Sequence, residues 1–275
     1  MTVVEALAAA RARIPVAEAR LLLGHVLGRS AAWLEAHRDA ALPAGAAAQL
    51  SALTERRAAG EPVAYLLGHR EFYGRSFGVT PDVLIPRPET ELLVELASEK
   101  VDAGRTAAIL DLGTGSGCLA ITLALELPRA RLTAVDVSPA ALAVARSNAE
   151  RLGARAAFVA SDWFAALPAQ RFDLIVANPP YVAAGDPHLT EGDLRFEPLG
   201  ALTDHADGLA AIRRIVAEAP RWLGVGGWLL LEHGYDQQAA VRSLLEDAGF
   251  GSIEQHRDLA GIVRASAGRY CFSRE

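Results

Sequence analysis

Four consecutive residues, Asn178-Pro179-Pro180-Tyr181, are the part of this sequence best suited to chemistry. Proline fixes the backbone φ and has no N–H, and a residue before proline is held extended, so the segment is stiff. The side-chain oxygen of Asn178 and the carbonyl of Pro179 can therefore accept the two N–H groups of a planar amide or aromatic amine. Tyr181 can stack on that flat group and exclude water. The pattern predicts a site that orients an NH2 group for attack on an electrophilic carbon.

A planar NH2 group is a weak nucleophile because its lone pair is delocalised. Holding the group in line with its target can lower the activation free energy by about 7–11 kcal/mol. The alkylated nitrogen is acidic enough to lose its proton without a strong base. We therefore predict catalytic roles for Asn178, Pro179 and Tyr181, and a substrate-binding role for these residues and Pro180. The alternative is an ordinary Asn-Pro turn.

A second motif, Asp111-Leu112-Gly113-Thr114-Gly115-Ser116-Gly117, ends one predicted strand and opens a helix. Glycine permits a tight turn and close approach of a ligand to the backbone, and a helix N-terminus offers free N–H groups. The dinucleotide fingerprint Gly-x-Gly-x-x-Gly requires its last glycine at position 118, but Cys118 stands there and the third glycine is Gly117. The loop instead resembles the S-adenosylmethionine (AdoMet) loop of Rossmann-like methyltransferases. A dinucleotide site and a turn without ligand are the alternatives.

This resemblance assigns the parts of the cofactor to particular residues. Asp136 ends the next predicted strand, where an acidic residue suits the two ribose hydroxyls. Asp162 and Trp163 follow the third strand, where this class holds the adenine; Trp163 covers the ring face or packs in the core. The methionine part would lie on the turn formed by Gly113, Thr114, Gly115, Ser116 and Gly117.

Elements that could position these motifs alternate along the second part of the chain. Near-continuous apolar strands that alternate with helices are typical of a parallel sheet covered on both faces. The predicted strands are 107–111, 131–136, 156–160, 172–177 and 227–232, followed by two short strands within 250–275. The predicted helices are 116–127, 138–152, 208–220 and 236–249. Both motifs then lie at the carboxyl edge of the sheet, where open α/β sheets bind ligands.

The first part of the chain has a different rhythm. Apolar residues recur at helical spacing through residues 1–60, which predicts three or four short helices. We expect a helical N-terminal domain over residues 1–72, a hairpin and linker over 73–90, and an α/β domain over 91–275.

Composition excludes several classes of protein. The net charge is −6, with residues 1–80 at +2 and the remainder at −8, which argues against a protein that grips long nucleic acid by counterion release. Two cysteines, Cys118 and Cys271, cannot build a disulfide framework or a four-ligand zinc site, and the seven histidines lack metal-site spacing. No apolar stretch is long enough to span a bilayer. We expect a cytoplasmic monomer without metal.

Taken together, the motifs resemble those of the HemK/PrmC family, which methylates the glutamine side-chain amide of the Gly-Gly-Gln motif in class I peptide chain release factors. The resemblance rests on Asn178–Tyr181, on Asp111–Gly117, and on three further segments: 85–91 (IPRPETE), 196–202 (FEPLGAL) and 258–264 (DLAGIVR). It implies a Rossmann-like seven-stranded AdoMet-dependent methyltransferase domain preceded by a small helical domain that docks the release factor, with S-adenosyl-L-homocysteine as the product.

The resemblance also implies roles for individual residues. Asn178 would contact AdoMet as well as the glutamine, and Glu197 would line or close the substrate site, or else form an ion pair that holds its loop. Arg87 and Glu89 would brace the cofactor-side wall or form a salt bridge between domains. Two rivals stay open: a nucleic-acid exocyclic-amino (adenine) methyltransferase, which shares the Asn-Pro-Pro-Tyr pattern, and a non-catalytic module that binds AdoMet or NAD.

Overall fold

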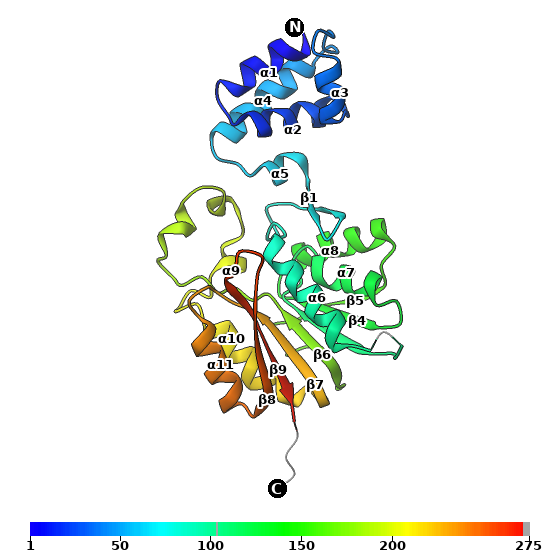
Figure 1. Cartoon of the computed structure of the whole chain (residues 1–275), viewed down its shortest axis with the longest axis vertical. Coiled ribbons are helices and arrows are strands. Elements are labelled where there is room, and N and C mark those ends of the chain that lie inside the picture. Colours follow the sequence, from blue (N-terminus) through cyan, green and yellow to red (C-terminus); the bar gives the residue numbers. More distant parts are fainter. Residues whose placement is uncertain (103, 272–275) are drawn as a thin grey trace. The chain divides into compact units, whose positions relative to one another are not determined.

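The computed structural model describes residues 1–102 and 104–271 (Figure 1). The chain forms two compact units. One contains Met1–His69 and the short segment Thr190–Phe196, and the other contains Arg70–Leu189 and the chain from Glu197 onward. The inclusion of Thr190–Phe196 in the first unit was not anticipated from the sequence.

The first unit is helical. Its helices are α1 (Val3–Arg11), α2 (Val16–Leu27), α3 (Ala31–Ala36), α4 (Ala46–Ala58) and α5 (Val63–Leu67). The first helix begins with a capping box, in which the Thr2 hydroxyl accepts from the Glu5 amide and the Glu5 carboxylate accepts from the Thr2 amide. Apolar side chains from α1, α2, α3, α4 and α5 form one core around Leu22 and Leu23, both fully buried. The predicted helical character of residues 1–60 is confirmed.

The segment Thr190–Phe196 is tied to this helical unit by arginine side chains. The Arg57 guanidinium donates to the carboxylate of Asp193 at 2.8 Å and to that of Glu18 at 2.7 Å. Arg195 donates to the carbonyl of Ala59. The loop that follows Asn178–Tyr181 along the chain thus belongs in part to the N-terminal unit.

The second unit opens with the hairpin and the connecting segment. The hairpin strands are β1 (His69–Phe72) and β2 (Arg75–Gly78), so the hairpin starts a few residues before the expected range of 73–90. A short 3-10 turn, η1 (Pro88–Thr90), leads into α6 (Glu91–Lys100), with Pro88 in the first turn as its fixed φ favours.

A seven-stranded sheet forms the centre of the second unit, in the order β5-β4-β3-β6-β7-β9-β8. The strands are β3 (Ala108–Leu112), β4 (Arg131–Asp136), β5 (Ala156–Ala160), β6 (Phe172–Ala177), β7 (Leu223–Glu232), β8 (Phe250–Arg257) and β9 (Val263–Tyr270). Strands β3 to β7 are parallel, and β9 is antiparallel to both of its neighbours. The predicted Rossmann-like sheet is confirmed, with β7 starting four residues earlier than expected.

Helices cover both faces of this sheet (Figure 1). Alternate strand residues feed two separate cores: Leu174 and Val176 pack with α6 and α7, whereas Ile175 and Ala177 pack with α10 and α11. The covering helices are α6, α7 (Cys118–Glu126) and α8 (Pro139–Leu152) on one side, and α10 (Ala210–Glu218) and α11 (Gln238–Asp247) on the other. The loop between β6 and α10 contains the short elements η2 (Pro187–Thr190), η3 (Leu194–Phe196) and α9 (Leu199–Leu202). Within the described part of the chain, no helix has the length and apolarity to cross a membrane.

Candidate active site

The two sequence motifs leave the sheet from adjacent strands. In the parallel register of β3 and β6, Leu112 lies opposite Ala177. Gly113 and Asn178 are the next residues of the two strands, so the glycine loop and the Asn-Pro-Pro-Tyr segment begin side by side. The chain runs from β3 to β4 in one direction and continues with β6 on the other side of β3, which makes this edge a topological switch point, the usual ligand site of an open α/β sheet.

The glycine loop has a conformation that only glycine adopts easily. Gly113, Gly115 and Gly117 all have positive φ, at 74°, 53° and 83°. A Cβ on Gly117 would lie 2.7 Å from Ile121 Cδ1, whereas a Cβ on Gly115 would meet no atom within 4 Å. Gly117 is therefore needed for packing against α7, and Gly115 leaves open space in front of the loop.

Asp111 and Thr114 stabilise this loop from inside. The Thr114 hydroxyl donates to Asp111 Oδ2 at 2.6 Å, and both side chains are buried. Burial raises the pKa of Asp111 to about 7, which the hydrogen bond from Thr114 partly offsets. Asn148 of α8 donates to the carbonyl of Ser116 at 2.9 Å. Thr114 and Ser116 thus shape the turn.

Asp136 faces the glycine loop from the end of β4. Its Oδ2 accepts from the Gly115 amide at 2.8 Å and its Oδ1 accepts from the Ser138 amide at 2.9 Å. Each carboxylate oxygen has a second lone pair, so the group can still accept two further hydrogen bonds. This is the capacity that two ribose hydroxyls require.

Trp163 stands against the other side of the loop in a strained conformation. Its φ is +51°, and its ring atom Cζ3 would lie 3.5 Å from a Cβ on Gly113. The Ser161 hydroxyl donates to the Trp163 carbonyl at 2.8 Å and accepts from the Ala166 amide at 3.0 Å, which holds this turn. Backbone strain at such a residue costs about 1–3 kcal/mol and commonly marks a functional site.

The carboxylate of Asp162 is directed to a different partner. Arg214 of α10 donates to both of its oxygens at 2.8 Å, and the pair is exposed to solvent. Asp162 still lines the site described below, beside Trp163.

Asn178 and Tyr181 are joined to one buried carboxylate. Asn178 Nδ2 donates to the Thr90 hydroxyl at 3.0 Å, and that hydroxyl donates to Glu232 Oε2 at 2.7 Å. The Tyr181 hydroxyl donates to Glu232 Oε1 at 3.1 Å. Burial beside Glu232 raises the pKa of Tyr181, so the phenol stays protonated. With its nitrogen engaged by Thr90, Asn178 retains its oxygen as an acceptor.

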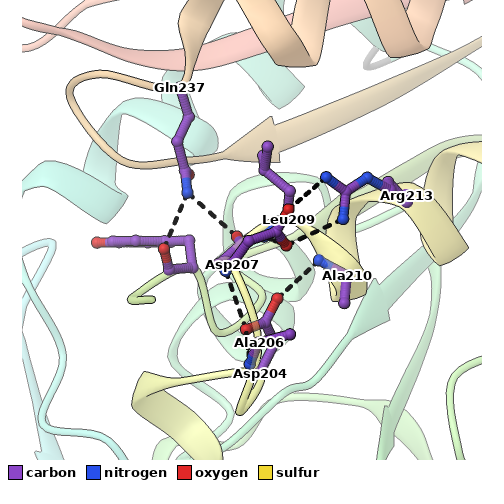
Figure 2. A network of polar contacts seen from close by, with 9 residues as sticks. Asp204, Ala206, Asp207, Leu209, Ala210, Arg213 and Gln237 are labelled. Carbon is purple, nitrogen blue, oxygen red and sulfur yellow. Dashed lines mark hydrogen bonds and ion pairs between the residues drawn. The ribbon is translucent and has the colours of Figure 1, made fainter. Parts of the chain in front are cut away.

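The backbone of the same segment is held from α11 and the preceding loop. Gln237 Nε2 donates to the carbonyls of Tyr181 at 3.0 Å and Gly208 at 3.1 Å. Figure 2 shows Gln237 together with the loop before α10, in which Asp204 accepts from the amides of Ala206 and Ala210. The loop also carries the ion pair of Asp207 and Arg213 (Figure 2). These contacts fix the exit of the Asn-Pro-Pro-Tyr segment.

We expect the variant Gln237→Ala to lower the free energy of unfolding by about 1–3 kcal/mol, because it leaves two carbonyls without their side-chain donor. The neighbouring variant Gln238→Ala is a matched control, since Gln238 is exposed, and should change stability by less than about 0.5 kcal/mol. Urea unfolding followed by circular dichroism measures both. Equal effects of the two variants would contradict this assignment.

Glu197 has the loop-holding role that the sequence left open as an alternative. Its side chain is fully buried; Oε1 pairs with Arg87 and Oε2 accepts from the Ile85 amide at 2.9 Å. Its neighbours Pro198, Gly200 and Ala201 line the cavity, but Glu197 itself does not. The ion pair with Arg87 therefore positions one wall of the site, and any contact of Glu197 with a substrate remains a prediction.

One cavity of the second unit brings most of the predicted site residues together. Of those residues, Gly113, Gly115, Asp136, Asp162, Trp163, Asn178 and Pro180 line it, whereas Thr114, Ser116, Gly117, Pro179, Tyr181 and Glu197 do not. The lining also includes Asp82, Val83, Leu84, Val137, Ser138, Ala141 and Ser161, which sequence reasoning missed. Ser138 and Ala141 had a usable signal, because they open the helix directly after Asp136.

We looked for side chains that could bind a metal ion together. Among residues 1–102 and 104–271, no group of three or more His, Cys, Asp or Glu side chains is placed to bind a metal ion.

Comparisons with known proteins agree with this geometry. The family model "PrmC N-terminal domain" matches residues 2–68, and the model "Methyltransferase small domain" matches residues 88–191. A release factor glutamine methyltransferase from Bordetella pertussis is 58% identical over 257 residues, which cover 93% of this chain and 95% of the relative. The chain belongs to the HemK/PrmC family of release factor glutamine methyltransferases.

Other relatives extend this result. A family member from Burkholderia pseudomallei is 57% identical over 259 residues, covering 92% of this chain and 91% of that protein. The solved structure of a methyltransferase from Pyrococcus furiosus is similar in fold, with a TM-score of 0.56 at 17% identity, over 81% of this chain and all of that one. The methyltransferase fold predicted from the sequence is thus confirmed.

The site fits the AdoMet expected of a HemK/PrmC protein. One cavity is lined by Gly115, Asp136, Trp163 and Asn178. There is open space in front of Gly115, and Asp136 can accept two further hydrogen bonds. These groups match a small polar chain, a ribose and a flat base in that order.

Proposed function

We propose that this protein transfers a methyl group from AdoMet to the side-chain amide nitrogen of the glutamine in the Gly-Gly-Gln motif of class I peptide chain release factors. The observation that carries the proposal is the register of β3 and β6, from which Asn178 and the glycine loop leave the sheet side by side and line the same cavity as Asp136. Membership of the HemK/PrmC family supports a glutamine amide as the NH2 group.

The residues of this chain supply positioning rather than acid–base chemistry. Asn178 Oδ1 and the Pro179 carbonyl accept the two amide N–H groups, and the Tyr181 ring covers the flat amide. AdoMet supplies an electrophilic sulfonium methyl: the new N–C bond forms as the C–S bond breaks, and the electron pair leaves with the sulfur of S-adenosyl-L-homocysteine. The methylated amide nitrogen then releases one proton to solvent. Pre-positioning of this kind lowers the activation free energy by about 7–11 kcal/mol.

The helical unit is proposed to dock the release factor. Residues 1–80, which include most of this unit, carry a net charge of +2 in an acidic chain. The unit's segment Thr190–Phe196 is part of the loop that follows Tyr181. We propose that the protein acts in the cytoplasm as a monomer without stable binding of nucleic acid, and light scattering after size-exclusion chromatography measures its mass.

A single labelling experiment tests the proposed function. The protein is incubated with methyl-labelled AdoMet, a class I release factor and duplex DNA, and the label is followed in each macromolecule. We expect label in the release factor, on the glutamine of its Gly-Gly-Gln peptide. A release factor with that glutamine changed to alanine is the control and should take up none. Label in DNA alone would favour the nucleic-acid amino methyltransferase, and transfer to neither would favour a binding module.

A further inference from the structure

A fully buried acid, Glu232, lies behind the Asn-Pro-Pro-Tyr segment at the end of β7. Its two oxygens have different partners: Oε1 accepts from the Tyr181 hydroxyl at 3.1 Å and Oε2 accepts from the Thr90 hydroxyl at 2.7 Å. Thr90, only 3% exposed, accepts in turn from Asn178 Nδ2 at 3.0 Å. One carboxylate thereby reaches two residues of the motif, one of them through a relay.

The chemistry of these groups gives the relay a direction. An ionised carboxylate only accepts hydrogen bonds, so the single hydroxyl proton of Thr90 must point to Glu232. The Thr90 oxygen then has only lone pairs to offer to Asn178, and it can bind the NH2 end of that amide but not the oxygen end. The Asn178 amide is consequently turned so that its oxygen is the group left for a ligand.

We propose that Glu232 is a positioning residue that sets, through Thr90, which end of the Asn178 amide faces the substrate, while it holds the Tyr181 ring through the phenol. This inference rests on the proposed function, because an amide substrate needs an acceptor at Asn178. If the relay were reversed, Asn178 would present N–H groups to the substrate N–H groups and could not bind them.

The charges around Glu232 make this orientation sensitive to pH. Besides Thr90, the groups that change the pKa of Glu232 are Tyr181 after β6, Glu89 in η1 and Arg264 on β9. The charge of Glu232 in turn raises the pKa of the Cys118 thiol in α7. Burial raises the pKa of Glu232 to about 7, against the hydrogen bonds from Thr90 and Tyr181. Below that pH the carboxyl is protonated and can donate to Thr90, which permits the reversed order. We therefore expect kcat to fall as pH decreases through about 7.

The variants Thr90→Val and Thr90→Ser separate the relay from simple packing. Valine has nearly the same shape but no hydroxyl, so we expect kcat for the release factor to fall about 10–100-fold, with little change in the Kd of AdoMet. Serine retains the hydroxyl and should restore most of the loss. The acid limb of the kcat profile near pH 7 should disappear in Thr90→Val, because Glu232 no longer reaches Asn178.

A second measurement needs no substrate. Besides Asn178, the chain has only one asparagine, Asn148, and five glutamines that give side-chain NH2 signals. The side-chain NH2 signals of Asn178 can be identified by 15N NMR of the full-length protein as those that disappear in Asn178→Ala. We expect these signals to move with pH around 7 in the wild-type protein and to lose that dependence in Thr90→Val and in Glu232→Gln. Glu232→Gln provides the test if Thr90→Val does not fold.

The outcomes distinguish the two proposals. The relay is wrong if Thr90→Val keeps the wild-type kcat, or if Thr90→Val and Thr90→Ser are equally impaired. It is also wrong if the Asn178 signals keep their pH dependence in Thr90→Val and Glu232→Gln. Each of these results leaves methylation of the release factor by the wild-type protein unaffected. If the wild-type protein does not methylate a release factor, the proposed function fails, and the NMR titration still decides whether Glu232 orients Asn178.

Discussion

Replacing Asn178 with alanine should lower kcat for methylation of a release factor by about 10²–10³-fold, the usual cost of removing one preorganised hydrogen-bonding group from a reacting centre. The change removes the side-chain oxygen that we propose accepts one substrate N–H, and leaves the Pro179 carbonyl as the only proposed acceptor. The amide nitrogen is no longer held in line with the methyl carbon, so its weak nucleophilicity is not offset.

Binding of AdoMet by Asn178→Ala should remain within about threefold of wild type, because the glycine loop and Asp136 are untouched. Single-turnover kinetics with saturating release factor measures the transfer step, and calorimetry measures the Kd of AdoMet. A variant that turns over at the wild-type rate would remove Asn178 from the mechanism. A variant that loses AdoMet binding in proportion to kcat would show that its role is in holding the cofactor.

The sequence predicted the sheet well because its parallel strands are buried on both faces. Runs such as 172–177 (FDLIVA) are nearly all apolar, and the structure gives β6 these same bounds. The start of β7 was missed because residues 223–227 (LGVGG) carry three glycines, which weaken the strand signal. Gly226 indeed has a φ of +81°, so the irregularity is real even though the strand begins before it.

The sequence predicted those parts of the site that lie in one continuous motif. It did not predict the parts that depend on contacts between residues far apart in the chain. The glycine loop and the Asn-Pro-Pro-Tyr segment are continuous, so their position at the sheet edge followed from strand order. Glu232 is 142 positions from Thr90 along the chain, and nothing in the pattern around 223–232 distinguishes it from a polar residue that ends a strand. The pairing of Glu197 with Arg87 across 110 positions was left as one of two alternatives for the same reason.

Replacing Asp136 with alanine should raise the Kd of AdoMet by about 10–150-fold, which corresponds to losing a charge-assisted hydrogen bond worth about 1.5–3 kcal/mol. The structure adds a second reason, because Asp136 also accepts from the amides of Gly115 and Ser138 and so fixes the loop itself. The conservative variant Asp136→Asn keeps one acceptor oxygen and should fall between wild type and alanine.

An exposed aspartate at the end of α11 gives the matched control, since Asp247→Ala should bind AdoMet as wild type does. Thermal unfolding without AdoMet shows how much of the Asp136→Ala effect comes from the loop, and calorimetry gives the affinity. With release factor and AdoMet both saturating, kcat of Asp136→Ala should recover toward wild type, because the contact proposed for this carboxylate is with the ribose and not with the amide. If kcat stays low at saturation, Asp136 also affects the placement of the methyl carbon. If the Kd of AdoMet is unchanged in Asp136→Ala, the ribose contact is refuted.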